Sequence, residues 1–341
     1  MGESDQLESQ AQVVMPATDL NKELEFFEKL GFRLDHIYPD DSPVVAMMSG
    51  HGLRIRLDQN AKAHPAEINI LTDDAEVLNN GKAIVSPSGT LVTFEPKSYT
   101  VQSHETQHKF EVRKLQDSDP WVIGRAGMQY RDLIPGRLGG GIIASHIRIP
   151  EGGPVPDVVH YHIIGFQLIY CYKGWVKLVY EDQGPAFILE AGDCVTQPPE
   201  IRHRVLEASD NLEVIEIGVP AEHVTTIDHD MELPTTEFNP DRNFKGQKFC
   251  HHIGNVAKWS PWRIEGFEFR ETGIEEATGG VASVQVARLV KEAEIDIELQ
   301  HDADILFTFV MNGSMELSAA EYDASTLTTG DAFTVPPDLT Y

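Results

Sequence analysis

Two stretches of the sequence decide the fold: HYHIIGFQLIYCYKG at residues 160–174 and GDCVTQPPEIRH at residues 192–203. In the first stretch, His160 and His162 are two residues apart, so on a β-strand both imidazoles point to the same face. The second stretch brings a third imidazole, His203, on a later strand. Burying three imidazoles together is costly unless a partner such as a metal ion satisfies them. We therefore interpret the three histidines as one metal site.

The spacing within both stretches resembles the two sequence motifs of the cupin family. The first motif is His-x-His, four residues, an acidic or amide ligand, six residues and Gly, which matches Gln167 and Gly174. The second is Gly, five residues, Pro, four residues and His, which matches Gly192, Pro198 and His203. The resemblance implies a β-barrel that holds one divalent metal ion per chain, with Fe²⁺ favoured and Mn²⁺, Ni²⁺ or Zn²⁺ as alternatives. The ligands that it implies are His160, His162, Gln167 and His203.

Gln167 departs from the common pattern, because most metallocupins carry Glu at this position. An amide oxygen can complete the coordination, but it brings no negative charge and cannot act as a base. Glu207 lies four residues beyond His203 with the same strand parity, so it either projects into the cavity as a general base or lies at the rim in water. Arg131 is a second candidate catalytic residue, as a clamp for a substrate carboxylate. Its repeat counterpart Arg270 persists where the metal ligands do not, which favours a structural role.

An internal repeat predicts two barrels. Lys109-Phe110 aligns with Lys248-Phe249, and Gly140-Gly141 aligns with Gly279-Gly280, which sets a period of 139 residues. A period this long indicates duplicated domains and not a solenoid. The second copy keeps one histidine at the ligand positions, where it has Leu299, His301, Leu306 and Tyr341. We predict that the second barrel has lost its metal site. The sequence also ends before the last strands of a cupin barrel, so we expect truncation or closure by another segment.

The N-terminal part predicts a different kind of domain. Thr18 or Asp19 can cap a helix that Gly31 ends, and extended segments precede and follow it. The order strand, helix, strand, strand, strand resembles one module of the glyoxalase, or vicinal-oxygen-chelate, family, most clearly in ATDLNKELEFFEKLGF. The positions where that family places metal ligands hold Gln12 and Arg54 or Arg56. Arginine is positively charged, so it does not bind a metal cation. We therefore expect a packing or dimerisation element, against the alternative of a second active site.

These observations define a mainly β fold class: two cupin (double-stranded β-helix, jelly-roll) barrels preceded by a small α+β glyoxalase-like domain. The predicted organisation runs as follows: a disordered tail at 1–10, the glyoxalase-like domain at 11–97, a connector at 98–120, the metal-binding barrel at 121–222, a second connector at 223–260, and the degenerate barrel at 261–341.

Composition excludes several classes of partner. Acidic residues outnumber basic ones by 54 to 27, for a net charge of −27, so nucleic acid and anionic membrane surfaces would be repelled. No stretch is apolar for long enough to cross a membrane. Three widely spaced cysteines favour a reduced, cytoplasmic compartment over a disulfide scaffold. We expect a small-molecule substrate as the partner and leave a homodimer open.

The expected function is that of a metal-dependent bicupin enzyme acting on a small oxygen-rich organic substrate. A dioxygenase-type oxidoreductase is favoured, because an open three-histidine site resembles those that bind substrate and O₂ side by side. A non-redox isomerase, cyclase or lyase and a non-catalytic small-molecule binder remain as alternatives.

Overall fold

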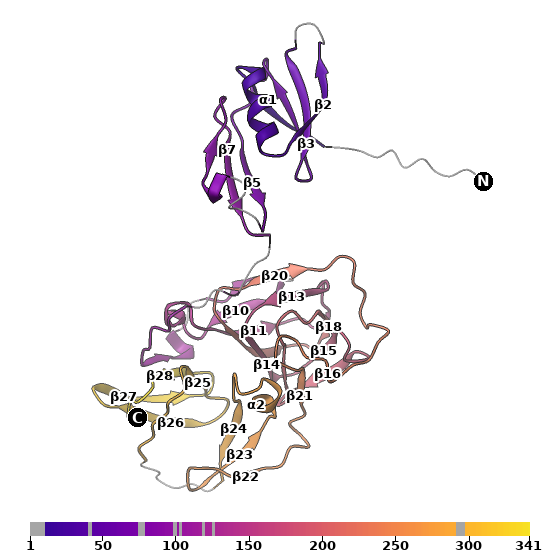
Figure 1. Cartoon of the computed structure of the whole chain (residues 1–341). Helices are drawn as coiled ribbons and strands as arrows, with labels where there is room; N and C mark the ends of the chain where they lie inside the picture. The colour runs from indigo at the N-terminus through magenta and orange to yellow at the C-terminus, as the bar shows by residue number, and fades with distance from the viewer. Residues whose placement is uncertain are drawn as a thin grey trace, which may run out of the picture. The chain divides into compact units, whose positions relative to one another are not determined.

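The computed structural model describes residues 11–39, 43–73, 79–97, 101, 104–117, 120–124, 127–290 and 297–341. The chain divides into two compact units, Met1–Tyr99 and Thr100–Tyr341, which are drawn in Figure 1. Each unit has hydrophobic clusters of its own. The predicted tail at 1–10 lies outside the described residues. No helix within the described ranges is long and apolar enough to cross a membrane.

The N-terminal unit begins with the predicted order of strand, helix and three strands. Asp19 caps the helix by accepting the backbone N–H of Lys22 at 3.2 Å, and Gly31 follows it with φ +91°. The strands pair in the order β1-β4-β3-β2, with β1 parallel to β4. These elements are β1 (Val13–Pro16), α1 (Leu20–Lys29), β2 (Arg33–Tyr38), β3 (Val45–Gly50) and β4 (Leu53–Asp58).

The rest of this unit is a three-stranded sheet in the order β5-β7-β6. Glu23 of α1 reaches it: this buried carboxylate accepts hydrogen bonds from the Ser86 hydroxyl at 3.1 Å and from the Ser88 N–H. The two sheets of the unit therefore share one core. The elements are β5 (Glu67–Leu71), η1 (Asn79–Gly81), β6 (Ile84–Val85) and β7 (Leu91–Glu95).

The second unit begins with a barrel of two sheets. The first sheet has the order β21-β17-β14-β19-β11-β10-β9, and the second has the order β16-β15-β18-β13-β20, with β12 paired to β18. The strands of the first sheet are β9 (Val122–Ile123), β10 (Gln129–Asp132), β11 (Ile143–Ile149), β14 (Phe166–Lys173), β17 (Cys194–Thr196), β19 (Leu212–Val219) and β21 (Cys250–His252). Those of the second are β12 (Gly153–Pro154), β13 (His160–Ile163), β15 (Trp175–Tyr180), β16 (Phe187–Glu190), β18 (His203–Ala208) and β20 (Val224–Ile227). A 3₁₀ turn, η4 (Arg137–Gly140), precedes β11.

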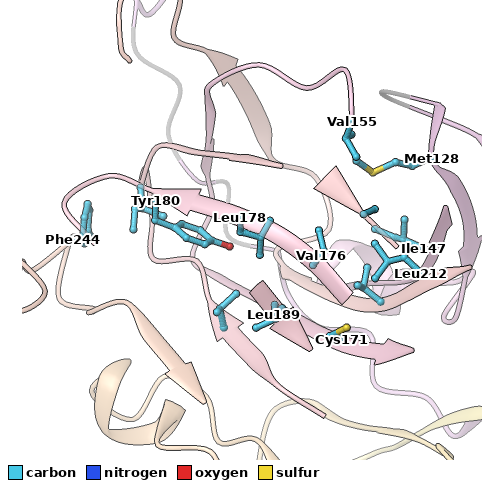
Figure 2. Close-up of a cluster of buried hydrophobic side chains, with 14 residues drawn as sticks. Met128, Ile147, Val155, Cys171, Val176, Leu178, Tyr180, Leu189, Leu212 and Phe244 are labelled. Carbon is cyan, nitrogen blue, oxygen red and sulfur yellow. The ribbon is translucent and has the colours of Figure 1, made fainter. Parts of the chain in front are cut away.

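Alternate side chains fill the interior between these sheets. Figure 2 shows Val176, Leu178 and Tyr180 along β15, in one buried cluster with Ile147 and Leu212 of the opposite sheet. Successive residues on a strand point to opposite faces, so the intervening residues of β14 and β19 face outward. These outward residues are apolar too, because they pack against the part of the unit that follows β21, which we call its C-terminal half. This explains why both strands are apolar on both faces.

Two segments that we predicted as connectors contribute strands. In the 223–260 segment, β20 pairs with β13 (His162 opposite Thr225) and β21 pairs with β17 (Cys194 opposite His252). In the 98–120 segment, β8 (Glu111–Arg113) pairs with β28 in the C-terminal half. Sheet edges that end unpaired leave backbone groups exposed, and these segments cover such edges.

The C-terminal half has smaller sheets in the orders β22-β23-β24, β25-β28-β8 and β26-β27. Phe110, Leu317, Leu327 and Phe333 form its own buried cluster. Its remaining elements are η2 (Leu115–Asp117), β22 (Ser260–Pro261), β23 (Phe267–Glu271), α2 (Ile274–Ala277), β24 (Gln285–Leu289), β25 (Leu306–Phe309), β26 (Ser314–Ala319), β27 (Tyr322–Thr328) and β28 (Ala332–Val335).

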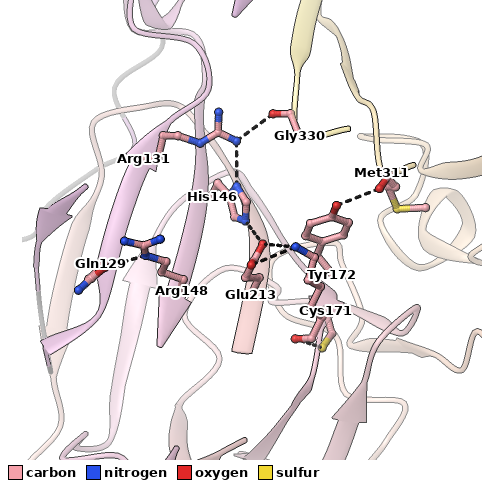
Figure 3. A network of polar contacts seen from close by, with 10 residues as sticks. Gln129, Arg131, His146, Arg148, Cys171, Tyr172, Glu213, Met311 and Gly330 are labelled. Atoms are coloured by element: carbon pink, nitrogen blue, oxygen red, sulfur yellow. Dashed lines mark hydrogen bonds and ion pairs between the residues drawn. The ribbon is translucent and has the colours of Figure 1, made fainter. Parts of the chain in front are cut away.

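A buried polar network lies where the outer face of the first barrel meets this half (Figure 3). Arg131 of β10 donates from Nη2 to His146 Nδ1 and to the carbonyl of Gly330, both at 2.9 Å. His146 Nε2 then donates to Glu213 at 2.8 Å, and Lys173 pairs with the same carboxylate at 3.1 Å. The network links β10, β11, β14 and β19 to the turn before β28.

Candidate metal centre

The structure brings the three predicted histidines together inside the first barrel. His160 and His162 lie on β13, and His203 opens β18 directly opposite His160 in the strand register. One ring nitrogen from each residue can be chosen so that all three lie within 4.8 Å of one another. This spacing suits nitrogen donors arranged around a single ion.

The Nδ1 atom of each imidazole has an oxygen partner. His160 Nδ1 lies 2.8 Å from the carbonyl of Val158, and His203 Nδ1 lies 3.0 Å from the carbonyl of Ile201. A carbonyl can only accept, so both Nδ1 atoms carry a hydrogen, and in the neutral imidazole the lone pair is then on Nε2. His162 Nδ1 has a similar contact with the Thr225 hydroxyl at 2.9 Å. Metal-binding histidines are oriented in this way, so the donor set fits a divalent ion.

The three rings border a cavity of about 250 Å³ between the two sheets. Its walls are mostly aliphatic, and the described lining residues include no lysine or arginine. The polar lining residues besides the triad are Tyr130, Ser145, Tyr180, Gln197, Glu216, His223 and Thr225. A cavity this small, with apolar walls and a few polar groups, suits a small ligand.

Gln167, the predicted fourth ligand, is 1% exposed and lies on the inward face of β14. Its Nε2 donates to Glu216 Oε1 at 2.6 Å, whereas its Oε1, the atom that would coordinate an ion, is buried without a hydrogen-bond partner. Glu216 lines the cavity and brings the carboxylate that the Gln167 position lacks. Its inward parity with Leu212 and Val214 along LEVIEIGV is the signal in the sequence that could have identified it.

Glu207 does not reach the cavity, which corrects its assignment as the base. The pairing of β15 with β18 shifts by one residue: Leu178 lies opposite Val205, but Lys177 lies opposite Glu207. The extra residue is a β-bulge, and a bulge reverses the inward and outward parity beyond it. Val205 therefore lines the cavity, whereas Glu207 shares the outward face with Lys177.

Arg131 also lies away from the cavity, so it is not a substrate clamp. Its neighbour Tyr130 lines the cavity, and alternation along β10 turns Arg131 to the opposite face. There it is 3% exposed, and burial lowers its pKa to about 10. Its bonds to His146 and Gly330 support the structural role that its repeat counterpart had favoured.

Two further side chains beside the triad had no signal in the motifs. Tyr180 stacks on His203, with 5.6 Å between the ring centroids, and burial raises its pKa above the usual range. The His223 ring lies 5.4 Å from that of His162 and also borders the cavity. Both positions depend on strand pairing and loop placement, which a local pattern does not encode.

The C-terminal half has no comparable cluster among its described residues. His301, the counterpart of His162, donates from Nε2 to the carbonyl of Val335 at 3.0 Å. Across the described parts of the chain, the triad is the one group of three or more His, Cys, Asp or Glu side chains with metal-site spacing.

No family model matches the sequence, and no curated protein matches it. Among solved structures, a salicylate 1,2-dioxygenase from Pseudaminobacter salicylatoxidans matches with a TM-score of 0.50 and 14% identity, over 70% of this chain and 81% of that chain. The oxalate decarboxylase of Lactobacillus farciminis in a formate complex matches with a TM-score of 0.49 and 12% identity, over 71% and 82% of the two chains. The oxalate decarboxylase of Bacillus subtilis at pH 4.6 matches with a TM-score of 0.46 and 11% identity, over 72% of this chain and 74% of that chain.

At 14% identity the likeness to the salicylate 1,2-dioxygenase concerns the fold alone, and it confirms the predicted mainly β, bicupin fold class. The chain is a mainly β protein with the bicupin fold and a small N-terminal α/β sheet, and its first barrel has a three-histidine candidate metal centre. The glyoxalase-like resemblance of residues 11–97 stays a prediction.

Proposed function

We propose that the chain is a metal-dependent bicupin enzyme, a dioxygenase-type oxidoreductase acting on a small oxygen-rich organic substrate. The observation that carries the proposal is the convergence of three imidazoles whose Nδ1 atoms are held by oxygen partners, at the wall of a cavity. His160, His162 and His203 would hold one divalent ion per chain, with Fe²⁺ favoured. A bound iron ion would supply a redox-active Lewis acid with positions for a substrate oxygen and for O₂.

Glu216 is the group in the cavity best suited to act as a general base. Its carboxylate faces the triad from the opposite sheet, and the Gln167 amide fixes its orientation at 2.6 Å. A base must lie within hydrogen-bond reach of the proton that it removes. In our proposal Glu216 takes the proton of a substrate hydroxyl, and the aliphatic walls exclude water.

The same carboxylate favours a second candidate function. A Lewis acid beside a base is sufficient for non-redox isomerase, cyclase or lyase chemistry, which needs no O₂. The redox proposal is preferred by analogy with the salicylate dioxygenase that shares the fold. Oxygen consumption by the iron-loaded protein, screened against catechols, diketones and hydroxy acids, separates the two candidates.

Metal analysis tests the proposal itself. We expect purified protein incubated with Fe²⁺ under anaerobic conditions to hold about one ion per chain, and His162→Ala to hold almost none, because two imidazoles bind a divalent ion far more weakly than three. His301→Ala is the matched control, since it removes the counterpart imidazole in the other barrel. Equal metal content in wild type and His162→Ala, or none in wild type with Fe²⁺, Mn²⁺, Ni²⁺ or Zn²⁺, would contradict the proposal.

A further inference from the structure

Tyr180 and Gln197 form a polar pair beside the triad that the proposed chemistry does not use. Tyr180 lies opposite His203, and His203 lies opposite His160, so the three residues are neighbours across β15, β18 and β13. Gln197 follows β17 in the facing sheet and donates from Nε2 to the Tyr180 hydroxyl at 2.9 Å. Both side chains line the cavity.

One polar atom of Gln197 has no hydrogen-bond partner. The side chain is 4% exposed, and its Oε1 is buried without a partner. If the amide is flipped, Oε1 accepts from the Tyr180 hydroxyl and Nε2 becomes the atom without a hydrogen-bond partner. One polar atom therefore stays unsatisfied in either orientation. An unsatisfied buried polar atom costs about 1–3 kcal/mol. A ligand hydroxyl, which both donates and accepts, would satisfy the pair with the amide in either orientation.

The size and lining of the cavity narrow the class of ligand. The aliphatic walls suit an apolar ligand body, and a volume of about 250 Å³ restricts the ligand to a small one.

We infer that Tyr180 and Gln197 recognise a hydroxyl group of the substrate, and that the substrate class is a small hydroxyl compound with an apolar body. This inference rests on the proposed function, because it takes the cavity beside the triad as the substrate site.

Ligand titration of the metal-loaded protein tests the inference. The probe is maltol, a small hydroxypyrone, and oxalate, which at neutral pH has neither a hydroxyl group nor an apolar body, is the comparison ligand. We expect Tyr180→Phe and Gln197→Leu each to weaken maltol binding by about five- to tenfold and to leave oxalate binding within about twofold. Loss of one hydrogen bond of about 1 kcal/mol has an effect of this size.

The control is Tyr161→Phe, a matched hydroxyl deletion on β13 at a position that does not line the cavity. We expect it to change maltol affinity by less than about twofold. The double variant Tyr180→Phe/Gln197→Leu removes both partners, so it leaves no new unsatisfied polar atom if a single variant misfolds.

Metal content measured in every titrated sample distinguishes the two kinds of failure. Absence of metal from wild type would contradict the proposed function. Full metal content with unchanged maltol affinity in the two variants and their double, or an equal weakening of maltol and oxalate binding, would overturn this inference and leave the proposed function standing.

Discussion

At the scale of single residues, the two glutamates near the triad predict opposite behaviour. Glu216 lines the cavity, whereas Glu207 lies beyond the bulge on the outward face of β18. If Glu216 is the base, Glu216→Gln should lower kcat by at least about 100-fold, as loss of general base catalysis typically does, and should keep the metal. Glu207→Gln should leave kcat within about twofold. Turnover on the first substrate identified by oxygen consumption, with metal content alongside, is the measurement.

The reverse result, with activity lost in Glu207→Gln and kept in Glu216→Gln, would identify Glu207 as the general base, as its strand parity with His203 had suggested. Parity predicted the inward direction of His160 and His162 because they are two residues apart on one strand. It failed for Glu207 because one extra residue between Val205 and Glu207 reverses the direction. A bulge depends on the pairing partner, so nothing local to β18 reveals it.

At the scale of secondary-structure elements, β11 has buried side chains on both of its faces. Ile147 faces the first barrel, while His146 is buried on the other side against Arg131 and Glu213. Burial, followed by the charge of Arg131, lowers the pKa of His146 to about 4. The unfolded chain, with a histidine pKa near 6.5, takes up this proton first as the pH falls. The stability that this pKa difference contributes is therefore fully present above about pH 6.5 and is lost as the pH falls towards 4.

We expect this linkage to cost about 2 kcal/mol of unfolding free energy between pH 7 and pH 5 and about 3 kcal/mol by pH 4. His146→Gln does not titrate and can keep both hydrogen bonds. The measurement is urea unfolding of both proteins from pH 7 to pH 5, read as the difference between their pH slopes. Parallel slopes would show that His146 titrates normally in the folded protein.

The elements themselves were predictable to different degrees. The N-terminal order of strand, helix and three strands followed from a cap at Asp19 and an apolar stripe, which are local signals. The repeat predicted two barrels, but not that β20 and β21 complete the sheets of the first barrel from the 223–260 segment, which we predicted as a connector. These strands are short, and their pairing is long-range, so they leave little periodicity in the sequence.

At the scale of the whole molecule, every part of the candidate centre belongs to the second unit. The three ligands, the oxygen partners of their Nδ1 atoms and the residues that line the cavity all lie between Met128 and Thr225. The N-terminal unit has its own buried cluster, which includes Met15, Phe27 and Ile55. Among the described residues, the division of the chain therefore separates a unit that holds the candidate metal centre from one that contributes no residue to it.

This division predicts that a chain of residues 100–341 binds metal like the full chain. We expect about one ion per chain in both, and an increase in melting temperature on metal addition that is lost in His162→Ala of either length. Binding to the folded state alone stabilises it by about 2.7 kcal/mol at a metal concentration 100 times the Kd, so the shift is measurable. A shortened chain that keeps its circular dichroism spectrum but binds no metal would show that the N-terminal unit is needed for the site.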